Sequence, residues 1–551
     1  MKYLNFLVTG FLFLLLSFPG LCQVISPGTV FFEEDLRINQ LKGKFSDAPS
    51  FIIRPNLFPV KEVGKFYNWK QNDSISPQKI KINILPLILR QQLNTHHPYN
   101  WNDGSIIPAK GYQQQISAGF FLKAGPFTIQ LQPELVIARN NSFAKFPSSH
   151  PDSIWRAYYT FLNHSDIPEQ MGTGTYAKLF PGQSSVRLNL GKLSLALSTE
   201  NLWWGPGVRN SLILSNTAPG FLHLSFNTKE PIKTPIGSFE WQLIGGKLKE
   251  SGILPPDTSR LFEGQPLYVP KPGGNRYLNA VAMTWHPKWV NGLYLGLSRS
   301  FVQYEHSING NFNDYLPVFS FFFKGNSRDE SNFGRDQLLA FYVRWVFEKE
   351  AAEIYAEYGR NDHSGDAVDF LVEPEHSRAY IVGLKKLFQK SGTKPDIEFF
   401  TEFANLESGK SGQLRDIPTW YQHHQIKHGY THFGQVLGAG IGPGSNSQTF
   451  GINWIQPAKR TGLFFERIAR QNDFYYDAFT AYKTHRSHWV DLSLNGNKSW
   501  KQKNWMLNAQ LSVIYSLNYQ WRNKLFPSTL LNGKTNVTNI FAGFTIAYLL
   551  N

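Results

Sequence analysis

The sequence predicts an all-β protein whose antiparallel strands close into a transmembrane barrel, and three observations lead to this fold class. A secretory signal opens the chain, which therefore leaves the cytoplasm. Only 17% of the 551 residues are charged and 15% are aromatic, whereas about a quarter of the residues in soluble proteins are charged. Alternating apolar and polar positions recur in segments of roughly ten residues, long enough to cross a bilayer as tilted strands. Strands of a soluble sandwich average about six residues.

Composition excludes two other classes of protein. The mean hydropathy of −0.31, with no apolar run near 20 residues after the signal, excludes a helical membrane protein. The 44 Phe, 24 Tyr and 15 Trp supply apolar surface that a disordered chain lacks. A large β-rich protein remains.

Residues 1–22 have the pattern of a signal peptide. Lys2 precedes an apolar stretch over residues 11–16, and a polar region begins at Gln23. Cys22 could instead accept a lipid, but Leu21 stands where lipoprotein signals carry a small residue, so we prefer cleavage before Gln23. The mature chain then has no cysteine and no disulfide. Its formal charge falls from +15 to +14, because one lysine leaves with the signal.

Residues 23–78 are predicted to form a small helical plug segment ahead of the barrel. Apolar residues recur at near-helical spacing from Phe31 to Leu41, and acidic residues at 33–35 suit the first turn of a helix. From about Lys79 onward the period changes to two. We therefore assign residues 79–551 to the barrel.

The hairpin over residues 186–198 shows the strand pattern most clearly. Leucine and valine alternate with polar residues on both sides of Gly191-Lys192, and glycine at the first position of a two-residue loop favours a type II′ turn. The same alternation occurs over residues 293–298, 352–359 and 539–551, the last strand. Polar faces that mix Arg, Glu, Asn and Ser are typical of a watery lumen.

Tryptophans lie near many of the predicted strand ends. Transmembrane barrels carry girdles of aromatic residues at both membrane interfaces. We assign to these girdles Trp285, Trp289, Trp345, Trp454, Trp500, Trp505 and Trp521.

Motifs for catalysis and metal binding give little support for an enzyme. No Gly-x-Ser-x-Gly elbow and no phosphate-binding loop occurs. The glycine-rich run over residues 438–444 has the wrong spacing for a nucleotide loop and contains Pro443, so we interpret it as a tight loop. His424, His428 and His432 would align as metal ligands only on a helix, which nearby glycines oppose. We interpret them as ordinary polar surface and expect no metal and no cofactor.

Two pairs of glutamates share the polar faces of predicted strands: Glu353 with Glu357, and Glu398 with Glu402. Four residues along a strand span about 13 Å, beyond the roughly 5 to 9.5 Å that separates the carboxylates of a glycosidase. A dyad formed across two strands stays open. We prefer the interpretation that these carboxylates balance lumen cations such as Arg187, Arg344 and Lys385.

The basic charge indicates an acidic or hydroxyl-rich partner rather than a nucleic acid. Positive residues are scattered, and no nucleic-acid recognition module occurs. An anionic polysaccharide or a lipid head group suits the cell surface better. Aromatic rings cover the apolar faces of sugars, while amides and guanidinium groups bond hydroxyls or uronates. Composition permits such a site without locating it.

A tryptophan motif and a glycine-rich block locate the site more closely. Asn-Leu-Trp-Trp-Gly-Pro-Gly covers residues 201–207, and Ser-Leu-Ile-Leu-Ser-Asn-Thr-Ala-Pro follows over 211–219. Gly-Ser-Phe-Glu-Trp-Gln lies at 237–242, and a block with Gly-Tyr, Leu-Gly and Gly-Pro-Gly-Ser lies over 429–445. In order, spacing and total length, most of the mature chain resembles the Wzi family of capsule assembly proteins.

The resemblance implies an outer-membrane barrel of about 18 strands with a small helical piece on the periplasmic side, which residues 23–78 would supply. It also implies a lectin-like activity: members bind capsular polysaccharide at the cell surface and help to keep the capsule attached. They are not known as enzymes. We accordingly expect capsular or exopolysaccharide and outer-membrane lipid as partners, no nucleic acid, and a monomer.

Seven residues in the two blocks are our candidates for carbohydrate binding: Trp203, Trp204, Arg209, Asn216, His223, Tyr430 and Gln435. An alternative interpretation is that the tryptophan motif only closes the lumen, because a rigid Gly-Pro turn under two rings is also a good plug. Two other functions stay open: a porin or substrate-specific channel, and a hydrolase of lipid or glycan, which the missing motifs make the weakest.

Overall fold

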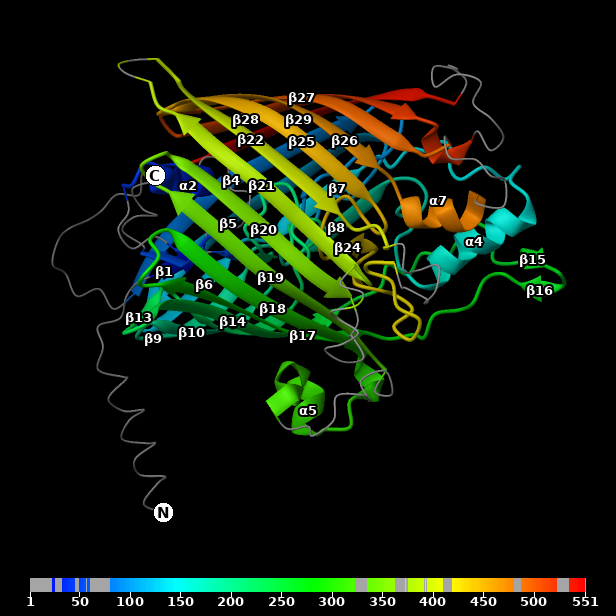
Figure 1. The fold of residues 1–551 in the computed structure, drawn as a ribbon, viewed down its shortest axis with the longest axis horizontal. Coiled ribbons are helices and arrows are strands. Elements are labelled where there is room, and N and C mark those ends of the chain that lie inside the picture. Colours follow the sequence, from blue (N-terminus) through cyan, green and yellow to red (C-terminus); the bar gives the residue numbers. More distant parts are fainter. Residues whose placement is uncertain are drawn as a thin grey trace.

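The computed structural model describes residues 22–24, 32–44, 49–55, 57–59, 80–322, 334–361, 372, 375–390, 392, 394–409, 419–479, 487–522 and 535–550. Residues 1–21 of the predicted signal peptide lie outside these ranges, so the signal stays a prediction. The described chain forms a closed antiparallel barrel; helices α4 and α7 and long connections gather at one end, whereas α2 lies at the other end (Figure 1). In these ranges, no helix is both long and apolar enough to span a membrane.

The wall of the barrel has 18 strands when the segments of an interrupted strand are counted as one, which confirms the predicted count. Its strands are β4 (Ile80–Asn94), β5 (Gly111–Ala124), β6 (Phe127–Leu131), β7 (Glu134–Ala138), β8 (Tyr176–Phe180), β9 (Ser185–Leu190), β10 (Leu193–Ser198), β12 (His223–Thr228), β13 (Ile232–Thr234), β14 (Gly237–Leu248), β17 (Arg276–Pro287), β18 (Leu293–Tyr304), β19 (Arg335–Phe347), β20 (Ala352–Asn361), β21 (Arg378–Phe388), β22 (Asp396–Asn405), β25 (Asn446–Gln456), β26 (Lys459–Ala469), β27 (Val490–Gln502), β28 (Trp505–Leu517) and β29 (Val537–Tyr548). Three of these strands are interrupted, and each consists of two segments: β6 with β7, β8 with β9, and β12 with β13. Pairing of β29 with β4 closes the barrel.

The other described elements are short. Four small strand pairs join β1 (Cys22–Val24) to β3 (Leu57–Pro59), β2 (Ile53–Arg54) to β11 (Trp203–Trp204), β15 (Leu261–Phe262) to β16 (Gln265–Pro266), and β23 (Thr431–His432) to β24 (Gln435–Val436). The helices are α2 (Phe32–Leu41), α4 (Asp152–Asn163), α5 (Phe312–Tyr315), α7 (Asn472–Phe479) and the 3-10 turns η1 (Glu305–Ser307), η2 (Pro317–Phe322) and η6 (Tyr519–Trp521). Helix α2 is the N-terminal helix that the sequence predicts, with its acidic residues in the first turn.

The hairpin of β9 and β10 shows how alternation in the sequence produces a wall. Its two-residue turn begins at Gly191, whose φ of 54° glycine adopts without strain. Val186 and Leu195 point outward and are 49% and 48% exposed, whereas Arg187 is buried on the inner face. Because successive side chains point to opposite faces of a strand, the apolar face covers the outside and the polar face lines the inside, as predicted.

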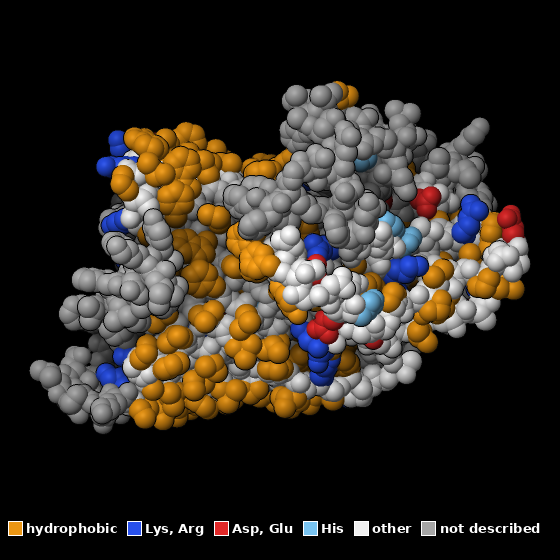
Figure 2. All heavy atoms as spheres, turned by 90° about the horizontal axis from the view of Figure 1, so that it is seen from below, with side chains coloured by type: hydrophobic (Ala, Val, Ile, Leu, Met, Phe, Trp, Pro, Cys, Tyr) orange, Lys and Arg blue, Asp and Glu red, His pale blue; other side chains and the backbone are white. Residues whose placement is uncertain are grey.

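Outward-facing side chains form an apolar band around the barrel (Figure 2). Ile82 and Leu224 are 63% and 58% exposed although both are apolar. A surface of this kind is stable only against lipid, and closed barrels of this type belong to outer membranes. The short turns then face the periplasm and the long connections face the cell exterior.

Six of the seven tryptophans predicted as girdle residues lie at the short-turn rim. Trp289 is 68% exposed there, and the ring of Trp505 lies 4.5 Å from that of Tyr548. The prediction is wrong for Trp521, which is 1% exposed and packs 4.8 Å from Phe474 of α7 at the opposite end. Trp521 belongs to the short turn η6 that follows β28. Its contact with α7 joins distant parts of the chain, and its position just beyond a strand could not reveal that contact.

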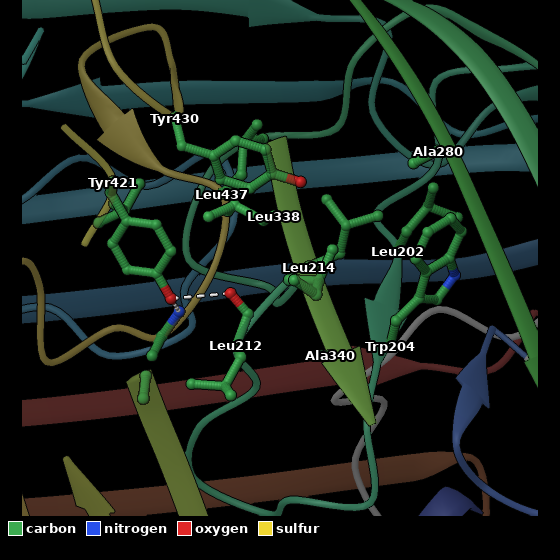
Figure 3. Close-up of a cluster of buried hydrophobic side chains, with 14 of the residues drawn as sticks. Leu202, Trp204, Leu212, Leu214, Ala280, Leu338, Ala340, Tyr421, Tyr430 and Leu437 are labelled. Atoms are coloured by element: carbon green, nitrogen blue, oxygen red, sulfur yellow. Dashed lines mark hydrogen bonds between the residues drawn. The ribbon is translucent and has the colours of Figure 1, made fainter. Parts of the chain in front are cut away.

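Part of the interior is a packed core rather than the watery lumen that the polar strand faces predict (Figure 3). Trp204, Leu212 and Tyr421, from segments that return into the barrel, are fully buried there. They pack against wall strands that carry small inward side chains such as Ala280 and Ala340. Small residues on the wall leave room for loops to return into the barrel, so the inner faces of these strands meet protein instead of water.

Candidate functional site

The tryptophan motif is a strand inside the barrel. β11 pairs with β2, so Trp203 lies opposite Arg54 and Trp204 opposite Ile53. The indole N–H of Trp204 donates to Oε1 of Gln242 at 2.8 Å, which satisfies its only polar atom. The guanidinium of Arg54 covers the ring of Trp203 at 4.5 Å. Both rings are almost completely buried, with Trp203 at 4% and Trp204 at 0% exposure.

Two wall glutamates hold the loop that follows the motif. Glu402 of β22 accepts hydrogen bonds from the backbone N–H groups of residues 208, 209 and 210 at 2.7, 3.0 and 2.8 Å. Glu357 of β20 accepts from the N–H groups of Gly207 and Leu212 at 3.2 and 2.9 Å. A loop inside a barrel has little water to satisfy its donors, so these carboxylates replace the water.

This arrangement corrects the prediction that the four glutamates balance lumen cations. Glu353 does pair with Arg344 and Arg37, and Glu398 lies 3.6 Å from Lys385. Glu357 and Glu402 instead bind the backbone of the loop over residues 207–212. Arg187, the remaining predicted partner, pairs with Glu200. Donors that lie about 150 and 190 residues away in sequence could not be inferred from the strand pattern.

Arg209 fixes the far side of the same loop. Its guanidinium binds both oxygens of Glu466 at 3.0 Å and lies 4.3 Å from the ring of Trp101 and 4.8 Å from that of Phe464. Bidentate pairing and ring stacking are geometries that a guanidinium favours. Arg209 therefore locks the loop to β26.

Close approach explains why the motif contains glycines. At Gly205, whose φ is 149°, a Cβ atom would overlap Oε1 of Glu357. At Gly207 a Cβ would overlap the carbonyl oxygen of Asn210. Only glycine lets the loop come this near to the wall and to itself.

The two sequence blocks meet in the core (Figure 3). The Tyr421 hydroxyl donates to the carbonyl of Leu212 and accepts from the N–H of Ala439, both at 2.8 Å. The N–H of Ser215 donates to the carbonyl of Leu437 at 2.8 Å. Sequence reasoning missed Tyr421, although an aromatic pair at 420–421 ahead of the glycine block was a visible signal.

The seven candidate residues are mostly buried. Trp203, Trp204, His223, Tyr430 and Gln435 are between 0% and 6% exposed, and Arg209 and Asn216 are half-buried. Asn216 donates to the carbonyl of Asn102 at 2.8 Å, and Gln435 lies 3.5 Å from the carbonyl of Gly104. His223 stands apart in the wall, at the start of β12.

A chamber of about 380 Å³ lies between α2, the motif loop and the wall of β4–β6 and β27–β29. Trp203 and Asn216 reach it, so the structure brings two of the seven candidates to one cavity. Its lining is rich in amides and hydroxyls: Asn102, Gln115, Gln130, Gln132, Gln183, Asn497, Asn508, Ser105, Ser117, Ser499 and Thr545. Such groups can bond sugar hydroxyls or water.

A second hollow of about 310 Å³ lies at the outer end, beside α4. Lys145, Thr173 and Lys271 contribute polar groups, and Pro255 and Pro256 contribute apolar surface. The ammonium of Lys271 donates to the carbonyl of Leu162 at 2.8 Å. This groove is formed by connections between strands, where the sequence carried no motif.

The histidines do not form a metal site in the described part of the chain, and the segment is not helical. The prediction of polar surface holds for His424 but is wrong for His428 and His432, which are 1% and 2% exposed. His428 contacts the Tyr304 hydroxyl and Glu250, each at 3.0 Å. Burial lowers the pKa of His428 to about 3, so its ring is neutral at pH 7. The glycine run at 438–444 is a loop, as predicted.

Comparison with known proteins identifies the family. A family model described as capsule assembly protein Wzi matches residues 95–524. Among solved structures, Wzi of Escherichia coli, an outer membrane protein involved in group 1 capsule assembly and described as a carbohydrate-binding β-barrel, has 14% identity and a TM-score of 0.57, and the match covers 94% of this chain and 98% of that one. OccAB2 of Acinetobacter baumannii has 9% identity and a TM-score of 0.40 over 84% and 97% of the two chains. No curated protein matches. The chain belongs to the Wzi family of capsule assembly proteins.

Proposed function

We propose that this protein binds capsular or exopolysaccharide at the cell surface and helps to assemble or retain the capsule, without catalysing a reaction. Membership of a capsule assembly family supports the role, and E. coli Wzi is described as carbohydrate-binding. The observation that carries the proposal is the loop-filled interior, in which Glu357, Glu402 and Glu466 hold the loop after the tryptophan motif. A barrel closed in this way suits a protein that holds a ligand better than one that conducts it.

We assign the first contact with polysaccharide to the outer groove. It lies at the end with long connections, where a surface chain would meet the protein. Lys145 and the hydroxyl of Thr173 can bond uronate and hydroxyl groups, and Pro255 and Pro256 can cover the apolar face of a sugar ring. We assign Lys271 a structural role in the groove, because its ammonium already donates a hydrogen bond to the backbone of α4.

The seven residues of the two sequence blocks have a framework role in this proposal. Trp203, Trp204, Arg209, Asn216, His223, Tyr430 and Gln435 would keep the interior closed and position the outer connections. Only Trp203 and Asn216 also reach the chamber, which makes the chamber the alternative place for a sugar contact. Outer-membrane lipid covers the apolar band, and the protein acts as a monomer.

The experiment compares a deletion strain with its parent. Polysaccharide bound to cells and polysaccharide released into the medium are measured, with total synthesis monitored. We expect release to rise while the total stays constant. If both fractions match those of the parent, retention is not the function, and single-channel conductance in planar bilayers then tests the alternative of a channel.

Polysaccharide binding by purified variants distinguishes the outer groove from the chamber as the binding site. The outer groove is tested with Lys145→Ala combined with Thr173→Ala, and the chamber with Asn216→Ala. Arg139→Ala, an exposed cation outside the groove, is the matched control. We expect only the groove variant to lose affinity for the polysaccharide of the source strain; loss in the chamber variant alone would move the site to the lumen.

A further inference from the structure

Two lysines face lipid near the short-turn rim of the barrel. Lys459 is the first residue of β26, and Lys498 lies on the adjacent strand β27. Both are exposed, and they alternate with the inward-facing residues Arg460 and Asn497, so their side chains point outward. Lys459 pairs in register with Trp500, two residues beyond Lys498. Diagonal neighbours of this kind lie about 7 Å apart, so one small anion can reach both ammonium groups.

Aromatic side chains frame this pair. Trp454 of β25 and Lys498 lie on either side of Thr461 in one row across the sheet. Trp500 occupies the next row toward the rim, beside Lys459. Tryptophan prefers the level of the lipid head groups. Lys498 lies farther from the turn than Trp500, so its backbone is on the hydrocarbon side of the girdle.

Neither lysine has a protein counter-charge in the described part of the chain, where no ion pair or hydrogen bond of their ammonium groups occurs. The outward faces of β25–β28 also carry no carboxylate. Two other lysines of the rim differ. Lys192 pairs with Glu230 at 3.2 Å, and the outward-facing Lys386 donates to the carbonyl of Glu350.

A cation on the lipid face costs free energy that grows with depth, so an unpaired lysine there favours an anion supplied by the membrane. The short turns place this rim in the periplasmic leaflet, whose head groups carry phosphate diesters. Indole rings on both sides can cover the glycerol and the first acyl carbons, while the Thr461 hydroxyl can bond a phosphate oxygen.

We propose that Lys459 and Lys498, framed by Trp454 and Trp500, form a binding site for the phosphate head group of an anionic glycerophospholipid. The occupant is a lipid rather than free phosphate, because the site opens toward the apolar band and not toward the lumen. Binding there anchors the strands β25–β27 at a fixed depth in the bilayer. The site is separate from the polysaccharide groove and is tested independently of it.

The test is native mass spectrometry of the full mature protein in detergent, titrated with phosphatidylglycerol or with phosphatidylcholine of the same acyl chains. The variant is Lys459→Gln combined with Lys498→Gln. The matched control, Lys192→Gln combined with Lys386→Gln, removes two charges from the same rim. Heat-modifiable mobility on gels verifies that each barrel is folded.

We expect the wild type and the control to bind phosphatidylglycerol in preference to phosphatidylcholine. In the Lys459/Lys498 variant that affinity should fall by on the order of twentyfold, since each lysine near an anionic lipid surface contributes about a factor of five. Equal binding of the two lipids, an unchanged variant, or an equal loss in the control would overturn the proposal. Displacement of the lipid by inorganic phosphate would also overturn it, because it would make the site one for a free anion.

Discussion

Replacing Glu402 by alanine is expected to release the loop over residues 205–212 while leaving the barrel closed. The carboxylate accepts three backbone N–H groups of the loop, together with the Asn210 side-chain amide at 3.1 Å and the Tyr355 hydroxyl at 3.0 Å. A hydrogen bond to a charged group contributes about 1.5 kcal/mol or more. The three backbone bonds alone therefore represent about 4.5 kcal/mol of local stability, before water that enters the vacated space restores a part of it.

Hydrogen exchange measured by mass spectrometry reports the local stability of this loop. Because 1.4 kcal/mol corresponds to a factor of ten, peptides covering residues 205–212 should exchange on the order of 10² to 10³ times faster in Glu402→Ala. Glu398→Ala is the matched control, since Glu398 faces inward from the same strand but accepts a hydrogen bond from Asn453 and lies 3.6 Å from the ammonium of Lys385, with no bond to the loop. Unchanged exchange in Glu402→Ala, or equal acceleration in the control, would refute the assignment of Glu402 as the residue that holds this loop.

Trp203, Gly205 and His97 give three further predictions. Trp203→Ala should destabilise the closed interior by about 3 kcal/mol and lower the melting temperature, with polysaccharide affinity unchanged; a normal melting temperature with lost affinity would instead make Trp203 a sugar contact. Gly205→Ala should reduce the yield of heat-modifiable folded barrel, because the new methyl group would overlap Glu357, whereas Gly496→Ala, with free space around its Cβ, should fold normally. His97 lies buried in the connection that follows β4, and burial lowers its pKa to about 4 from an ordinary 6.5, so this connection binds the proton more readily when open than when folded. Local stability should therefore fall by up to about 3 kcal/mol as the pH drops from 6.5 to 4, seen as smaller protection factors for the amides of residues 95–100 once exchange is corrected for the pH dependence of its intrinsic rate; protection factors that do not change with pH would contradict this.

Much of the wall was predictable because strand alternation is a local property. Val186 and Arg187 are neighbours in sequence, and the strand geometry alone sends one side chain outward and the other inward. Gly191 needed no distant partner to specify a tight turn. The small helix ending at Leu41 followed from its own spacing in the same way.

The candidate site was predictable only in part. The sequence singled out Trp203 and Trp204 as unusual, and left open whether they bind ligand or close the lumen. Their near-complete burial, with Gln242 and Arg54 as partners, became visible only with the tertiary structure. Likewise, Glu402 looked like one polar position on a strand until the loop at 208–210 was seen to lie on it.

The sequence by itself determined the barrel, its approximate size and the family motif. Tertiary structure decided that loops fill part of the interior, that His428 and Trp521 are buried, and that Lys459 and Lys498 stand together on the lipid face. The physical reason is the range of each interaction. Alternation and turn chemistry act between residues a few positions apart, whereas the packing of a loop depends on which strands, hundreds of residues away, surround it once the barrel has closed.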